Sequence, residues 1–159
     1  MYTTVIPNDT EIAERVAVLK RFRTLLEQQR LKFREYLTVL EKQEKSISDE
    51  NTEAILQHAE LEESIIAEIF TIQKVIDPLE YMYTNICANQ SGSDIPHLKT
   101  DLNNLQQRVL DQNKKNRELL KNHISGLRQQ VASLKRPYAH KESVYAGTAR
   151  TAALIDLSL

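Results

Sequence analysis

An apolar residue recurs every seven positions through the first part of the chain, and nothing interrupts the repeat. Its members are Ile12, Leu19, Leu26, Phe33, Leu40 and Ile47. No Gly or Pro lies between residues 10 and 45, so this stretch contains no helix breaker. A seven-residue spacing is the period of a helix that packs along another helix. The repeat therefore predicts one long amphipathic helix that begins near Asn8, which has capping-box spacing to Glu11.

A polar break at residues 46–52 separates this helix from a second one. Ser48 or Asp49 is the expected N-cap of the second helix. The apolar residues of the second helix recur at alternating steps of four and three: Ile65, Ile69, Ile72, Ile76, Leu79, Tyr83 and Ile86. Pro78 lies inside this pattern. Because the pattern keeps its register across the proline, we expect a kink near Pro78 and not an end of the helix.

A loop at residues 89–93 precedes a third helix, for which Ser93 or Asp94 is the expected cap. The apolar residues of this helix form two groups, Leu98, Leu102, Leu105 and Val109, followed by Leu120, Ile124, Leu127, Val131 and Leu134. The residues between the two groups, 111–116, are polar all round. Pro137 is expected to end the helix.

These three segments predict an all-α fold, an antiparallel, coiled-coil-like bundle of three long helices over residues 9–136. Residues 46–93 carry one Lys and nine Asp or Glu, a net charge of −8, whereas residues 1–45 carry +2 and residues 94–159 carry +5. The acidic second helix is therefore expected beside basic neighbours. Residues 1–8 form an N-terminal tail. The C-terminal tail, residues 137–159, is too short for a core of its own, so it either packs back on the bundle or is mobile and orders on a partner.

No pattern in the sequence predicts an active site, a cofactor or a metal. The chain has no Gly-rich phosphate loop and no HExxH or CxxC motif. His58 and Glu62 stand one helical turn apart, but no second such pair accompanies them, so a solvated helix face is the favoured interpretation. The basic cluster Lys114, Lys115, Arg117 and Lys121 lacks interleaved aromatics. We expect it to be a solvated face near the acidic second helix and not a nucleic-acid site.

Cys87 is the only cysteine, which excludes an intramolecular disulfide and favours a reducing compartment. It is either a small core residue or a reactive thiol. No apolar run approaches the roughly 20 residues needed to cross a bilayer, and the first residues lack the basic region and apolar core of a secretion signal. We therefore expect a cytoplasmic protein without membrane insertion.

The layout of residues 25–69 is similar to that of a known family. A helix rich in Leu and Glu is followed by the turn Ser48-Asp49 and then by Glu60-Leu61-Glu62-Glu63-Ser64-Ile65-Ile66. The third helix carries Asn116-Arg117-Glu118-Leu119-Leu120. In this layout, which covers most of residues 10–145, the chain resembles FlgN-type flagellar export chaperones. It departs from the family in a turn without Gly and in the terminus Ala-Leu-Ile-Asp-Leu.

The resemblance implies a chaperone that prevents premature assembly of the proteins it binds and that has no enzymatic activity. Such a protein binds the helical terminal segments of hook-associated proteins, which form the hook-filament junction, and delivers them to the flagellar type III export apparatus, a further candidate partner. The expected contact surface combines one face of the third helix with the tail: Leu120, Ile124, Leu127, Val131, Leu134, Tyr138, Val144, Tyr145, Leu154, Ile155 and Leu157. The alternative is a structural coiled coil or homo-oligomeric scaffold without a client. An enzyme of unrecognised type would need a pocket with convergent polar groups.

Overall fold

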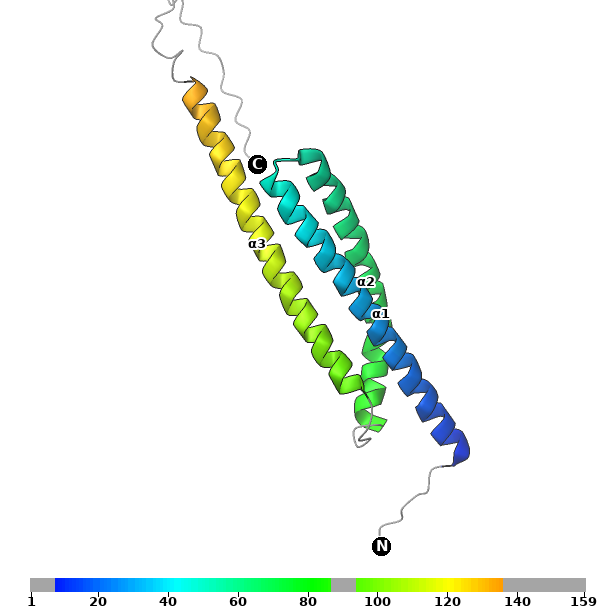
Figure 1. Cartoon of the computed structure of the whole chain (residues 1–159). Coiled ribbons are helices and arrows are strands. Elements are labelled where there is room, and N and C mark those ends of the chain that lie inside the picture. The colour runs from blue at the N-terminus through cyan, green and yellow to red at the C-terminus, as the bar shows by residue number, and fades with distance from the viewer. Residues whose placement is uncertain (1–7, 87–93, 136–159) are drawn as a thin grey trace, which may run out of the picture. The chain divides into compact units, whose positions relative to one another are not determined.

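The computed structural model describes residues 8–86 and 94–135, which form three long helices (Figure 1). These are α1 (Asp9–Ser48), α2 (Thr52–Ile86) and α3 (Ile95–Lys135). No strand occurs in the two described ranges. The predicted all-α bundle of three long helices is thus confirmed. The predictions for Cys87 and for the C-terminal tail concern residues outside these ranges, as does that for most of the N-terminal tail.

The chain divides into two units, Met1–Lys121 and Asn122–Leu159, and the division falls within α3. In the first unit all three helices contribute to the core. One cluster of buried side chains consists of Tyr36, Leu37, Val39, Leu40, Ile65, Leu105 and Val109. A second consists of Phe22, Leu26, Ile76, Ile95, Leu98 and Leu102. Because each cluster draws on all three helices, burial of these apolar side chains is the main force that holds the first unit together.

The start of α1 does not share in this core. Leu26, Leu40 and Ile47 of the seven-residue repeat are buried, but Ile12 is exposed, and so is Val16 in the next turn. The backbone oxygen of Asn8 accepts a hydrogen bond from the Ile12 amide at 3.1 Å. The side chain of Asn8 makes no capping hydrogen bond. The helix therefore begins where the capping-box spacing predicts, but without the side-chain contact of a capping box.

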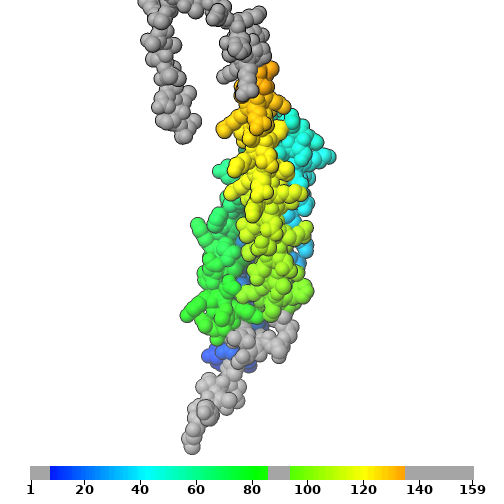
Figure 2. All heavy atoms as spheres, turned by 90° about the vertical axis from the view of Figure 1, so that its left-hand side faces the viewer, coloured from blue at the N-terminus to red at the C-terminus, as the bar shows by residue number. Residues whose placement is uncertain are grey.

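Cations from both other helices pair with the acidic α2, as the distribution of charge predicts. Lys32 Nζ of α1 lies 2.6 Å from Glu68 Oε2, and Lys99 Nζ of α3 lies 2.6 Å from Glu80 Oε1. Figure 2 shows α2 and the first part of α3 side by side. Exposed pairs of this kind contribute only a few tenths of a kcal/mol each. They favour the correct pairing of helices more than they stabilise it.

The polar stretch after residue 45 is more helical than predicted. Ile47 is buried, and the hydroxyls of Ser46 and Ser48 donate hydrogen bonds to carbonyl oxygens four residues earlier, at 3.0 and 3.1 Å. These bonds let both serines remain in the helix. As a result α1 continues to Ser48 and the connection to α2 is very short.

The cap of α2 is Asn51, so the prediction of Ser48 or Asp49 is wrong. The side-chain oxygen of Asn51 accepts a hydrogen bond from the Ala54 amide at 3.2 Å, which is the contact an N-cap provides. Ser48 is still part of α1, and Asp49 follows it in the turn. Glu50 completes the turn with a φ of +58°, in the left-handed region that Gly adopts most easily.

α2 runs through Pro78 without ending. In Figure 1 the last, green part of α2 runs at an angle to its first part, in keeping with the predicted kink. α3 begins at Ile95, and the Asp94 carbonyl accepts a hydrogen bond from the Leu98 amide at 3.0 Å. Asp94 also pairs with Arg23 of α1 at 2.7 Å. The start of α3 is therefore joined to α1 by charge as well as by the core.

Candidate functional site

The apolar residues in the last part of α3 are exposed, although residues at the same spacing earlier in α3 are buried. Leu102 is 6% exposed, whereas the later residues are exposed by 43% (Ile124), 46% (Leu127), 51% (Val131) and 70% (Leu134). Leu120 is half-buried. At about 100° per residue, these five side chains lie on one face of the helix. We call them (Leu120, Ile124, Leu127, Val131 and Leu134) the α3 stripe.

The spacing of the α3 stripe suits a helical partner. Its members follow one another at steps of four, three, four and three residues, the pattern by which one helix packs along another. A contiguous row of exposed Leu, Ile and Val side chains often marks an interaction surface, because soluble proteins seldom leave large apolar patches in contact with water. None of the helices in the described ranges has a stretch long and apolar enough to cross a membrane.

The polar residues that precede the α3 stripe add hydrogen bonds to the contact of α3 with α1. Asn116 is 3% exposed, and its Nδ2 donates hydrogen bonds to the Leu40 carbonyl at 2.8 Å and to Gln43 Oε1 at 3.1 Å. Gln112 Nε2 donates to Asn116 Oδ1 at 2.9 Å and also to Glu44. The stretch is polar on every side, but one side of it is a buried polar seam against α1 and is not exposed to solvent. Sequence reasoning missed this seam.

The same seam holds one cation of the basic cluster. Lys115 Nζ lies 2.7 Å from Glu44 Oε1 of α1. This pair, with the hydrogen bond from Gln112, lowers the pKa of Glu44. Lys115 is exposed, as expected for a solvated face, and its ion-pair partner lies on α1 and not on the acidic α2.

Tyr36 of α1 links all three helices. Its hydroxyl donates a hydrogen bond to Glu62 Oε1 of α2 at 2.7 Å and accepts one from Asn113 Nδ2 of α3 at 3.4 Å. Burial, followed by the bond to Glu62, raises the pKa of Tyr36. Glu62 therefore has a structural partner, and His58 Nδ1 lies 3.3 Å from Ser46 Oγ. No cluster of three or more potential metal ligands occurs among the described residues.

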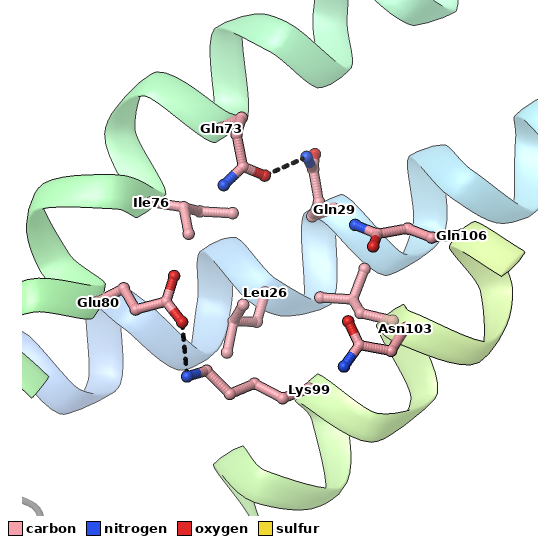
Figure 3. A pocket seen from close by; sticks show the side chains of 9 residues that line it. Leu26, Gln29, Gln73, Ile76, Glu80, Lys99, Asn103 and Gln106 are labelled. Atoms are coloured by element: carbon pink, nitrogen blue, oxygen red, sulfur yellow. Dashed lines mark hydrogen bonds and ion pairs between the residues drawn. The ribbon is translucent and has the colours of Figure 1, made fainter. Parts of the chain in front are cut away.

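A cavity of about 190 Å³ lies between the three helices of the first unit (Figure 3). Gln29, only 1% exposed, donates hydrogen bonds there to the Ile69 carbonyl at 3.2 Å and to Gln73 Oε1 at 3.1 Å. The other lining residues are Leu26, Ile76, Glu80, Lys99, Leu102, Asn103 and Gln106. They include no Ser, Thr, Cys or His, and Lys99 is paired with Glu80. The lining suits hydrogen bonding between helices more than nucleophilic or acid–base chemistry.

An apolar groove of about 550 Å³ lies along the outer side of the α1–α2 contact. Its apolar walls are Leu31 and Val39 of α1 and Leu61 and Ile65 of α2. Leu31 and Leu61 are more than half exposed. Sequence reasoning missed this groove, because both leucines fall outside the inward-facing repeats. Their apolar character at outward positions was the only available signal.

The structure brings together only the helical part of the predicted contact surface. All five residues of the α3 stripe share one face, and four of them are exposed. The predicted tail residues lie outside the described ranges: Tyr138, Val144, Tyr145, Leu154, Ile155 and Leu157.

Comparison with known proteins finds a relative that matches almost the whole chain. A protein of Treponema pallidum (strain Nichols), described as an uncharacterized protein, is 38% identical to this chain over 157 residues, which cover 96% of this chain and 96% of that protein. No protein-family model matches the chain, and no solved structure matches it either.

Proposed function

We propose that this chain, which belongs to the same protein family as the Treponema pallidum protein, is an export chaperone of the FlgN type. In this role it acts in the cytoplasm and binds the helical terminal segments of hook-associated proteins. It keeps these segments from assembling with one another and delivers them to the flagellar type III export apparatus. The proposed function requires binding alone and involves no catalysis, cofactor or metal.

The exposed α3 stripe is the observation that carries this proposal. A chaperone that prevents helical segments from assembling needs to cover an apolar helix face with an apolar face of its own. Leu127 and Val131 are about half exposed. In a helix with only a structural role, the residues at such positions would be either buried or polar. Their contact with water costs free energy that a bound helix would recover.

The polar seam supports the proposal in a second way. Asn116 holds α3 against α1 through two hydrogen bonds, and the α3 stripe begins four residues later at Leu120. Because buried amides bond to specific partners, they fix the register of one helix on another. The seam therefore fixes the part of α3 in the first unit at which the α3 stripe begins.

Two experiments on the full chain test the proposal. The first is co-purification of tagged chain with the hook-associated proteins of the same bacterium. The second is light scattering of a purified hook-associated protein with and without the chain. We expect a soluble complex and suppressed assembly. Unchanged scattering and no retained hook-associated protein would refute the proposal.

A homo-oligomeric scaffold without a client is the second candidate, and the start of α1 favours it. Ile12 is 45% exposed and Val16 is 57% exposed, so these residues of the first helix are also available to a second copy. Sedimentation velocity over a range of concentrations separates the two functions. A scaffold self-associates with rising concentration, whereas a chaperone without its client is expected to keep one mass.

A further inference from the structure

Positive charge runs along one edge of the α3 stripe and not along the other. Arg117, Lys121 and Arg128 are exposed, and at about 100° per residue all three fall on the same side of the stripe. The opposite edge carries His123 and Gln130, and so has no Lys or Arg. No Asp or Glu follows Glu118 in α3. The edge formed by Arg117, Lys121 and Arg128 is called the cationic edge below.

The charges of the cationic edge are largely uncompensated. Among the described residues neither Lys121 nor Arg128 forms an ion pair, in contrast to Lys115, which is paired with Glu44 at 2.7 Å. A partner seated on the α3 stripe would lie beside these cations. Rim charges of this kind select partners and raise association rates, even where each pair adds little affinity.

Three other occupants fit the cationic edge less well. A second copy of the α3 stripe would bring the same cations, so like charges would oppose pairing. The C-terminal residues 137–159 carry two basic and two acidic side chains, a net charge of zero, and so offer no complementary excess. A membrane-surface helix usually has cations on its whole polar face and aromatic side chains in its apolar face, whereas here the cations follow one edge and the stripe has no aromatic residue.

We infer that the α3 stripe receives an amphipathic helix of another protein whose apolar face is bordered by aspartate and glutamate side chains. This inference rests on the proposed function only in that the stripe binds a helix. The apolar face of the partner covers Ile124, Leu127 and Val131, and its acidic border lies along the cationic edge. In the terms of coiled coils, apolar positions give affinity and flanking charges choose the partner and its orientation.

Designed peptides test the inference on the full chain. Three amphipathic peptides share one apolar face and differ only in the residues that border it, which are Glu, Gln or Lys. Fluorescence anisotropy of labelled peptides then gives their dissociation constants. We expect the Glu peptide to bind most tightly and the Lys peptide about tenfold more weakly. This difference should shrink when salt is raised from about 50 mM to about 500 mM, because salt screens exposed charges.

Charge reversal on the protein provides the matched control. The double variant Lys121→Glu with Arg128→Glu should invert the order, so that the Lys peptide binds most tightly. The control variant, Lys42→Glu with Lys74→Glu, changes the net charge by the same amount at exposed positions of α1 and α2 and should leave the order unchanged. Circular dichroism confirms that both variants remain helical.

Several outcomes would overturn the inference. Equal binding of the Glu and Lys peptides would remove the role of charge, and an inverted order in the control variant would place that role elsewhere. Binding of anionic vesicles with no binding of peptides would identify a membrane surface as the ligand. Binding of the Glu peptide without retention of hook-associated proteins would leave the inference standing and refute only the proposed function.

Discussion

Shortening two side chains of the α3 stripe should weaken client binding without destabilising the protein. Full burial of a Leu or Val side chain contributes about 2 kcal/mol. Leu127 is 46% exposed and Val131 is 51% exposed, so a partner gains about half of this amount, or about 1 kcal/mol, from each. The double variant Leu127→Ala with Val131→Ala should therefore raise the dissociation constant about thirtyfold. Isothermal titration with a purified hook-associated protein measures the change.

The thermal stability of the same variant separates a binding surface from a core. Ala favours helix formation, and the lost side chains are half in water, so the Tm should change by no more than about 2 °C. Leu102→Ala is the matched control, since Leu102 is buried in the first unit. It should lower the free energy of unfolding by about 3 kcal/mol. If the double variant loses as much stability as Leu102→Ala, or binds with unchanged affinity, the α3 stripe is not the binding surface.

Four further predictions concern single residues, a pair of titratable groups and the C-terminal tail. Glu50 has a φ of +58°, so Glu50→Gly should stabilise the protein by up to about 1 kcal/mol in chemical denaturation. Asn116→Ala removes the two hydrogen bonds to α1 and should cost about 2 kcal/mol in the same assay. The pKa of Glu44 is lowered in the folded state, so its contribution to stability should be lost as the pH falls below about 4.5; the pKa of Tyr36 is raised, so its contribution should be lost as the pH rises above about 10. Denaturation across pH, repeated with Tyr36→Phe, checks both signs, because the variant should lose only the alkaline part. Deletion of residues 137–159 should leave the helical circular dichroism signal nearly unchanged and weaken client binding, and intact affinity would contradict a role for the tail.

The three helices could be predicted because long unbroken apolar repeats leave few alternatives. Leu26 and Leu40 recur in register with no Gly or Pro between them, and both are buried. The apolar pattern also keeps its register across Pro78, and α2 is continuous there. Burial of side chains at helical spacing is a collective effect of many residues, so the pattern predicts it even where single positions deviate.

The polar contacts could not be predicted from the sequence in the same way. Asn116 is a polar residue of a type that usually lies at the surface. Its burial depends on a hydrogen bond to the Leu40 carbonyl, 76 residues away in the chain. Ser46 and Ser48 lie in a polar stretch that suggests the end of a helix, yet both hydroxyls form hydrogen bonds within α1. Polar side chains have several alternative partners of similar energy, so the choice among them is made by tertiary packing.

The sequence predicts the shared face of the candidate site but not its exposure. The spacing of Ile124, Leu127 and Val131 predicts one apolar face on a helix, and the structure places them on one face. The same spacing is found at Leu98 and Leu102, which are buried. A periodic pattern predicts which side chains share a face, but it does not distinguish an exposed face from a buried one.

The proposed chaperone function is best tested by titration of the purified full chain with a purified hook-associated protein, followed by isothermal calorimetry and sedimentation. We expect a saturable complex with a dissociation constant of about 1 μM or tighter, as an apolar helix contact of this length can provide. Absence of binding at about 100 μM, together with growth in the mass of the chain alone, would contradict it.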